Sequence, residues 1–167
     1  MPTSAPRPNA IHRLIQSLAA TAPASWVLAR TLHFLDRPVL RWSSGRWSAA
    51  GLLTGLPTLM ITTTGARTGR QRTTPLVGLI DRERVVLVAS CFGSHHHPAW
   101  YHNLRRHPGA QVSFNGRSGS YVAREADGAE YESYWRQAVE LYAGYGAYKQ
   151  RTGARHIPIL VLTPRAD

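Results

Sequence analysis

Residues 62–75 read TTTGARTGRQRTTP, and the expected fold is organised around this stretch. Apolar runs flank it on both sides, LPTLMI at residues 56–61 and LVGLI at residues 76–80. Within it, Gly65 and Gly69 supply the backbone freedom that a tight reversal needs. The pattern therefore predicts two antiparallel strands joined by a short basic turn.

The turn carries Arg67, Arg70 and Arg72, separated by small and hydroxyl residues. A guanidinium group binds phosphate or carboxylate oxygens in a bidentate manner, so the turn is a candidate anion site. Arginine-rich hairpin turns are also common as solvated surface, which is the alternative interpretation. A P-loop is excluded, because the two glycines are too close together and no lysine follows them.

The composition is that of a globular protein. The 167 residues are 43% hydrophobic and 17% charged, which suits one domain with a sizeable core. The 20 lysine and arginine residues exceed the 9 acidic residues and give a net charge of +11. This charge favours an anionic partner, namely a polyanionic cofactor, a membrane surface or nucleic acid. The arginines are dispersed and no nucleic-acid signature is present, so we expect no nucleic-acid partner.

The first part of the chain resembles a pair of basic, tryptophan-bearing helices, with apolar residues at helical spacing. Such helices fit a peripheral membrane contact through residues 1–45, and a pocket lid or packing on a barrel are the alternatives. We therefore expect an N-terminal helical segment at residues 1–50 and a barrel domain at residues 51–167.

The sequence also bears on location. The opening residues MPTSAPRPNAIHRLIQSL lack the apolar core of a signal peptide, and no apolar run approaches the ~20 residues that span a bilayer. The single cysteine, Cys91, excludes an internal disulfide and a cysteine-based zinc site. We expect a cytoplasmic protein, peripheral at the inner face of the cell membrane if the N-terminal helices bind it.

Six apolar or alternating segments predict strands. They cover residues 59–64, 72–80, 85–91, 111–115, 118–125 and 157–162. Pro98 opens a short inserted helix, and Asp127 with Glu130 forms a capping-box pattern that starts a long helix. Short connections between strands predict a closed barrel of about six antiparallel strands, mainly β within the α+β class, rather than a sandwich or a parallel sheet.

Candidate catalytic and ligand-binding residues lie near the end of the third strand. Ser90 ends an apolar run that we expect to be buried on both faces, and His95, His96 and His97 follow in a loop. Consecutive histidine side chains diverge, and no carboxylate or cysteine joins them at ligand spacing, so we predict no metal. Ser90 lacks a nucleophile-elbow context, and the acidic residues are scattered. This pattern is typical of an enzyme that takes its chemistry from a cofactor.

Tyr142, Tyr145 and Tyr148 recur every three residues within YAGYGAY. The spacing puts them on one side of a helical segment, where core packing is one interpretation. Gly144 and Gly146 weaken a helix, so we expect the long helix to fray here. A frayed segment favours the second interpretation, an adaptable aromatic wall over a flat substrate.

Taken in this order, the motifs resemble the deazaflavin-dependent nitroreductase family, together with quinone reductases that use reduced coenzyme F-420. The matching stretches are TTTGARTGRQRTTPL (62–76), VVLVAS (85–90), HPAWYHNL (97–104), the spaced tyrosines and HIPILVL (156–162). The resemblance covers about residues 55–165. It implies a split β-barrel that binds coenzyme F-420 and transfers a hydride to a quinone, an activated enone or a nitroaromatic. An FMN- or haem-binding relative with the same barrel is the alternative.

The resemblance also implies roles for single residues. Ser90 and Tyr145 would be catalytic, and a small-molecule electron acceptor would contact Tyr142, Tyr145, Tyr148 and Val77. Arg67 and Arg72 would grip the phosphate and glutamate tail of the cofactor. The full set implied for cofactor binding is Arg67, Thr68, Arg72, Thr73, Thr74, Pro75, Ala89, Ser90, Cys91, His96, Ala99, Trp100, Tyr101 and Asn103. We expect a monomer or a weak oligomer.

The chain departs from the family pattern at three places. Arg67 stands where lysine is frequent, and Val77 stands where some members have tyrosine. Phe92 and the three histidines replace a glycine-rich stretch that contains lysine. These changes do not affect the cofactor that the resemblance implies. They do mean that the identity of the electron acceptor cannot be inferred from relatives.

Overall fold

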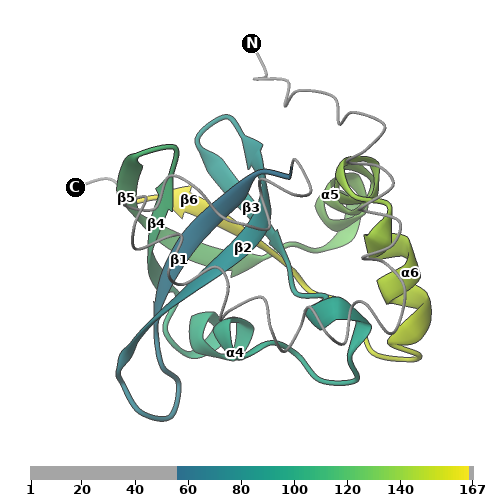
Figure 1. Cartoon of the computed structure of the whole chain (residues 1–167), viewed down its shortest axis with the longest axis horizontal. Coiled ribbons are helices and arrows are strands. Elements are labelled where there is room, and N and C mark those ends of the chain that lie inside the picture. Colours follow the sequence, from purple (N-terminus) through teal and green to yellow (C-terminus); the bar gives the residue numbers. More distant parts are fainter. Residues whose placement is uncertain (1–55, 166–167) are drawn as a thin grey trace.

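A computed structural model of the protein describes residues 56–165, so the helices expected before residue 50 lie outside the described residues (Figure 1). The strands are β1 Thr58–Thr64, β2 Gln71–Asp81, β3 Arg84–Val88, β4 Gly109–Phe114, β5 Arg117–Glu125 and β6 Ile159–Pro164. The helices are η1 Cys91–Gly93, α4 Ala99–Arg106, α5 Gly128–Leu141 and α6 Gly144–Arg151. Within residues 56–165, no helix is long and apolar enough to cross a membrane.

The six strands close into one barrel, in the order β1-β2-β3-β6-β5-β4, and each pairing is antiparallel. Closure comes from β1, which pairs with β2 on one side and with β4 on the other. The predicted antiparallel barrel is therefore confirmed. The third strand ends at Val88, three residues earlier than the apolar pattern predicts, because the chain turns into η1 after Ser90.

The barrel interior is filled by side chains that alternate along each strand. In β1, Leu59, Ile61 and Thr63 are buried, while the residues between them are half-buried on the opposite face. Helix α4 lies across one end of the barrel and adds Trp100, Tyr101 and Leu104 to the same interior cluster (Figure 1).

A second apolar layer lies between the outside of the barrel and helices α5 and α6, which lie together on one side of it (Figure 1). Val86 and Val88 of β3 face this layer, whereas Val85 and Leu87 face the barrel interior. The prediction that this strand is buried on both faces is confirmed.

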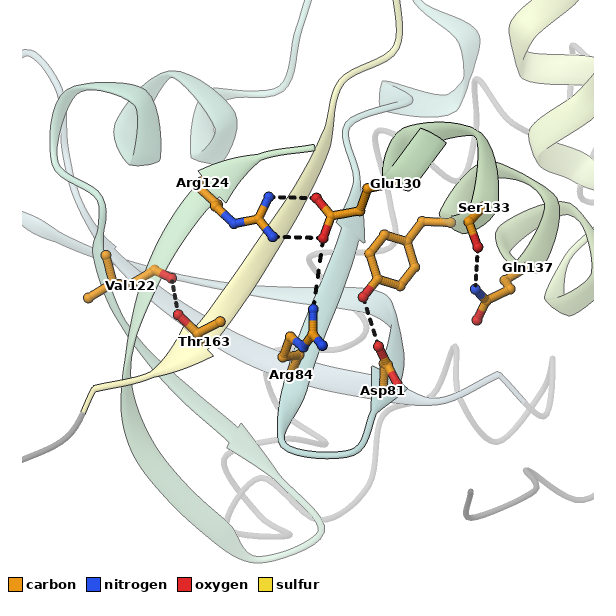
Figure 2. A network of polar contacts seen from close by, with 9 residues as sticks. Asp81, Arg84, Val122, Arg124, Glu130, Ser133, Gln137 and Thr163 are labelled. Atoms are coloured by element: carbon orange, nitrogen blue, oxygen red, sulfur yellow. Dashed lines mark hydrogen bonds and ion pairs between the residues drawn. The ribbon is translucent and has the colours of Figure 1, made fainter. Parts of the chain in front are cut away.

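The start of α5 differs from the predicted capping box. Asp127 is the N-cap residue but makes no side-chain capping hydrogen bond. The Glu130 carboxylate instead accepts two hydrogen bonds from the Arg124 guanidinium of β5, at 2.5 and 2.7 Å, and lies 3.8 Å from the Arg84 guanidinium of β3 (Figure 2). Arg84 is distant from Glu130 in the sequence, so the local pattern does not reveal it, whereas Arg124 lies only six positions before Glu130. The capping-box prediction is wrong. Glu130 instead connects α5 to strands β5 and β3 through Arg124 and Arg84.

The tyrosine segment also differs from its prediction. Tyr142 ends α5, and the chain continues as a separate helix, α6, rather than as a frayed end. Gly144 is buried, and a Cβ added there would overlap the Tyr142 ring. This glycine therefore permits close packing at the junction of the two helices, and the predicted fraying is wrong.

Candidate active site

The basic turn between β1 and β2 is held by backbone hydrogen bonds. The amide of Gly65 donates to the carbonyl of Arg70 at 2.9 Å, and the amide of Gly69 donates to the carbonyl of Gly65 at 2.8 Å. Gly69 has φ of 67°, in the region that only glycine adopts without strain. The predicted tight turn is confirmed.

The three arginines of the turn remain available to a ligand. Arg67, Arg70 and Arg72 are exposed, and no acidic side chain within residues 56–165 pairs with any of them. Three cations close together without counterions raise the local positive potential and attract an anion.

Asn103 of α4 attaches the basic turn to the end of the barrel. Its Oδ1 accepts a hydrogen bond from the Ala66 amide at 2.9 Å, and its Nδ2 donates to the Thr63 hydroxyl at 3.0 Å. Asn103 is buried, so both ends of its amide are used by the protein itself. Its side chain therefore positions the turn, and a direct cofactor contact through it stays a prediction.

The register of β2 divides the predicted cofactor residues between two faces. Thr73 pairs with Thr62 and their hydroxyls lie 2.8 Å apart, whereas Arg72 pairs with Thr63, which the α4 amide contacts. Because side chains alternate along a strand, Thr73, Pro75 and Val77 share the outer face, and Arg72 and Thr74 share the α4 side. The resemblance assigns Val77 to the acceptor and the other four residues to the cofactor, and it does not distinguish the two faces.

The loop after β3 has an unusual backbone. Cys91 and Phe92 have φ of 49° and 56°, in the left-handed region, and Gly93 follows at 80°. Non-glycine residues held in this region are strained and occur often at functional sites. Ser90, just before them, is 7% exposed, and its hydroxyl has no hydrogen-bond partner among residues 56–165. A buried hydroxyl without a partner costs free energy unless a ligand supplies the partner.

The histidines of this loop are not equivalent. His95 and His96 are exposed, and the Nδ1 of His96 lies 3.8 Å from the Cys91 sulfur. Burial raises the pKa of the Cys91 thiol, against smaller opposing effects of Ser94 and Arg155, so the thiol stays protonated at neutral pH. Among residues 56–165, no group of three histidine, cysteine or acidic side chains could hold a metal ion.

The three tyrosines form one aromatic cluster. The Tyr142, Tyr145 and Tyr148 rings meet edge to face, with centroids 5.4 to 6.1 Å apart, and the hydroxyls of Tyr142 and Tyr148 lie 3.0 Å apart. Burial raises the pKa of Tyr145, and its hydroxyl has no hydrogen-bond partner within the described part of the chain. The cluster contacts the Ser90 loop, because the Phe92 ring lies 6.1 Å from the Tyr148 ring. The fold thus brings the two predicted catalytic residues onto neighbouring elements.

Comparison with known proteins agrees with this geometry. The family model described as F-420H(2)-dependent quinone reductase matches residues 39–164. The chain belongs to this family. An F-420H(2)-dependent quinone reductase of Mycobacterium tuberculosis is 35% identical over 112 residues, which cover 65% of this chain and 74% of the relative.

Two solved structures are similar to this member of the quinone reductase family. The F-420-H2 dependent reductase FDR-A shares 36% identity at a TM-score of 0.59, over 64% of this chain and 93% of its own. A structure described as a domain-swapped dimer shares 31% identity at a TM-score of 0.62, over 84% and 99% of the two chains. The split-barrel fold implied by the resemblance is confirmed.

Several residues of the quinone reductase family pattern have structural partners here. Trp100 and Tyr101 lie in the barrel interior, and the Tyr101 hydroxyl donates to the Glu125 carboxylate at 3.1 Å. Ala99 and Thr68 are exposed, and Ala89 is fully buried. Cofactor contacts from these side chains stay predictions.

One residue near the Ser90 loop was missed by the sequence analysis. Arg155, between α6 and β6, donates to the Ser90 carbonyl at 2.7 Å and to the Ser94 carbonyl at 2.9 Å. It is one arginine among many and belongs to no motif, although it directly precedes the matched stretch HIPILVL. Contacts across more than 60 positions of sequence leave no local signal.

Asn103→Ala is expected to lower the free energy of unfolding by about 2 to 3 kcal/mol, because it leaves the buried Thr63 hydroxyl and the Ala66 amide without their partner. For a chain of this size the melting temperature should fall by roughly 4–12 °C. Thermal unfolding followed by circular dichroism measures this, with Arg106→Ala, an exposed change on the same helix, as the control. An unchanged melting temperature for Asn103→Ala would show that the amide does not hold the turn.

Proposed function

We propose that this chain, an oxidoreductase of the F-420H(2)-dependent family, reduces quinones, and that Ser90 and Tyr145 act directly on the reactants. The observation that carries the proposal is the pair of buried hydroxyls, on adjoining elements, that lack hydrogen-bond partners among residues 56–165. A bound ligand with carbonyl oxygens would supply those partners.

The residues present fit an anionic, flat cofactor. Arg67 and Arg72 are exposed cations without acidic partners among residues 56–165, which suits the phosphate and carboxylate groups of a tail. Arg72 lies on the α4 side of β2, toward the helix that the resemblance assigns to the cofactor. The aromatic cluster, which adjoins the Ser90 loop through Phe92, suits the ring system.

Coenzyme F-420H2, when bound, supplies a hydride as a two-electron donor. The chain's own task is to hold the acceptor against it and to stabilise negative charge on the acceptor oxygen. Because its pKa is raised, the Tyr145 phenol stays protonated at neutral pH and acts as a hydrogen-bond donor. The Ser90 hydroxyl is a second donor at the neighbouring loop. The buried aromatic cluster excludes water from this region.

Two further parts of the proposal rest on the sequence. A peripheral membrane contact through residues 1–45 would bring the site close to lipid-dissolved quinones, and sedimentation of the full chain with anionic vesicles decides it. The second part is the assembly state, which we propose to be a monomer or a weak oligomer. One similar structure is described as a domain-swapped dimer.

The test of the proposal is a fluorescence titration with F-420, followed by turnover of F-420H2 with menadione, a nitroaromatic and cyclohexenone. We expect the highest kcat/KM with menadione. A purified protein coloured by bound FMN or haem, without affinity for F-420, would contradict the proposal.

Arg72→Ala is expected to weaken F-420 binding about tenfold to a hundredfold, because one charge-assisted contact to an anion is worth about 1.5–3 kcal/mol. Arg70→Ala removes an equal charge from the same turn and is the matched control, with a smaller expected loss. Fluorescence titration gives both dissociation constants. Equal affinities for Arg72→Ala and the wild-type protein would remove Arg72 from the tail site.

A further inference from the structure

Arg155 makes an unusual set of contacts with the loop that follows β3. Its Nη2 donates to the Ser90 carbonyl at 2.7 Å, its Nε donates to the Ser94 carbonyl at 2.9 Å, and its Nη1 lies 3.3 Å from the Ala89 carbonyl. The same Nη1 lies 3.0 Å from the Nδ1 of His97. One planar guanidinium therefore contacts both ends of the loop.

No carboxylate in the described part of the chain compensates the charge of Arg155. Within residues 56–165 its hydrogen-bond partners are backbone carbonyls and one imidazole, and no acidic side chain pairs with it. Burial lowers the pKa of this guanidinium. A half-buried cation held by carbonyl dipoles and one neutral imidazole is an expensive way to stabilise a surface loop, since a neutral donor would do so without desolvating a charge.

The loop needs an anchor from outside itself. Cys91 and Phe92 are consecutive non-glycine residues in the left-handed region, so their backbone is maintained by its surroundings rather than by local preference. Within the loop, the amides of Gly93 and Ser94 donate to the carbonyls of Ser90 and Cys91. Among the described residues, the ends of the loop are also held by the Ala89 amide, which donates to the Pro158 carbonyl at 2.8 Å, and by Arg155. Both anchors come from the segment just before β6.

We propose that Arg155 is a positioning residue for hydride transfer: by binding the carbonyls of Ser90 and Ser94 and the His97 ring, it holds the Ser90 hydroxyl in the orientation that serves the reactants. The inference rests on the proposed function, in which Ser90 faces the deazaflavin and the acceptor. Arg155 itself touches neither.

The contact also fixes the protonation of His97. A guanidinium only donates, so the Nδ1 of His97 accepts, and the ring is neutral with its proton on Nε2. Burial lowers the pKa of His97, and Arg155 lowers it further. The other groups that face this ring act on its pKa more weakly: His102 and His156 lower it, Glu125 raises it, and Tyr101 lies against it. Acid that protonates His97 would break its bond to Arg155 and loosen the loop.

A variant that keeps the charge of Arg155 tests the importance of its geometry. Arg155→Lys keeps a cation but cannot contact Ser90, Ser94 and His97 in one plane. We expect it to lower kcat with menadione about tenfold to a hundredfold. Arg136→Lys, an exposed change on α5, should leave kcat unchanged.

A double-mutant cycle with Ser90→Ala tests whether Arg155 acts through the loop. If it does, Arg155→Lys should cost much less in the Ser90→Ala background than in the wild-type background. Additive losses in kcat would overturn the proposal, because a residue that only stabilises the fold has no reason to couple to the Ser90 hydroxyl.

The pH profile gives a readout that a purely structural role would not move. In Arg155→Gln the imidazole of His97 loses the neighbouring cation, so its pKa should rise, and the acidic limb of kcat/KM should move to higher pH. His97→Asn keeps an acceptor near the Nδ1 position but cannot titrate, so it should abolish the limb. A limb that stays in His97→Asn would overturn the proposal, and this variant decides the matter even if neither Arg155 variant folds. Failure of the wild-type protein to bind F-420 would instead refute the proposed function.

Discussion

Ser90→Ala is expected to lower kcat for menadione reduction about tenfold to a hundredfold, without destabilising the fold. The Ser90 hydroxyl is buried and has no hydrogen-bond partner among residues 56–165, so its removal breaks no hydrogen bond within them. Removing a buried group of this kind should raise the free energy of unfolding by about 1 kcal/mol, which is roughly 2–4 °C in melting temperature. Steady-state kinetics and thermal unfolding measure the two effects on the same preparation.

Thr152→Val is the matched control for Ser90→Ala. The Thr152 hydroxyl is also buried, but it donates to the Lys149 carbonyl at 2.9 Å. Its removal should lower the melting temperature and leave kcat unchanged. If Ser90→Ala behaved like Thr152→Val, the hydroxyl of Ser90 would be a structural group and the proposed donor role would be wrong.

The barrel was predictable from the sequence because its strands carry their own signal. Alternation in Thr58–Thr64 and the apolar run at residues 85–88 reflect one-sided and two-sided burial, and both are local patterns. The start of α5 shows the limit of local patterns. Asp127 and Glu130 have capping-box spacing, yet Glu130 pairs with Arg124, six positions earlier, and with Arg84 on a strand distant in sequence (Figure 2).

The parts of the candidate site that lie in sequence motifs were predictable. The part that depends on a residue distant in sequence was not. The basic turn and Ser90 stand in recognisable stretches, and the structure brings Ser90 close to the tyrosine cluster. Arg155 has no motif, and its partners lie more than 60 positions away. The division of Arg72 and Thr73 between two faces of β2 follows from the strand register, which pattern alone did not establish here.

The tyrosine cluster leaves two interpretations that one substitution separates. Tyr142 and Tyr148 share a hydrogen bond, so both hydroxyls are accounted for within the cluster. Tyr145 is equally buried, and its hydroxyl has no partner within the described residues. A packing role would be served as well by phenylalanine at this position. The Tyr145 hydroxyl is therefore the one that we propose to bind a ligand.

Tyr145→Phe is expected to lower kcat, and kcat/KM by the same factor, because it removes a contact made only in the transition state. The factor should reach ~10²–10³ if the phenol donates to the oxygen on which negative charge develops. Affinity for F-420H2 should barely change, since the ring and its edge-to-face contacts with Tyr142 and Tyr148 remain. The melting temperature should stay the same or rise by a few degrees, roughly 2–4 °C for each kcal/mol gained.

The change in kcat and the change in melting temperature together decide the role of Tyr145. Tyr148→Phe is the matched control, because it removes a hydroxyl of the same cluster that has a partner 3.0 Å away, and it should destabilise the fold. Burial raises the pKa of Tyr145, so the wild-type profile of kcat against pH should show no alkaline limb below about pH 10, the ordinary range of a phenol. A limb near neutral pH that vanished in Tyr145→Phe would make this residue an acid rather than a hydrogen-bond donor. Turnover of menadione at the wild-type rate by Tyr145→Phe would leave only the packing role.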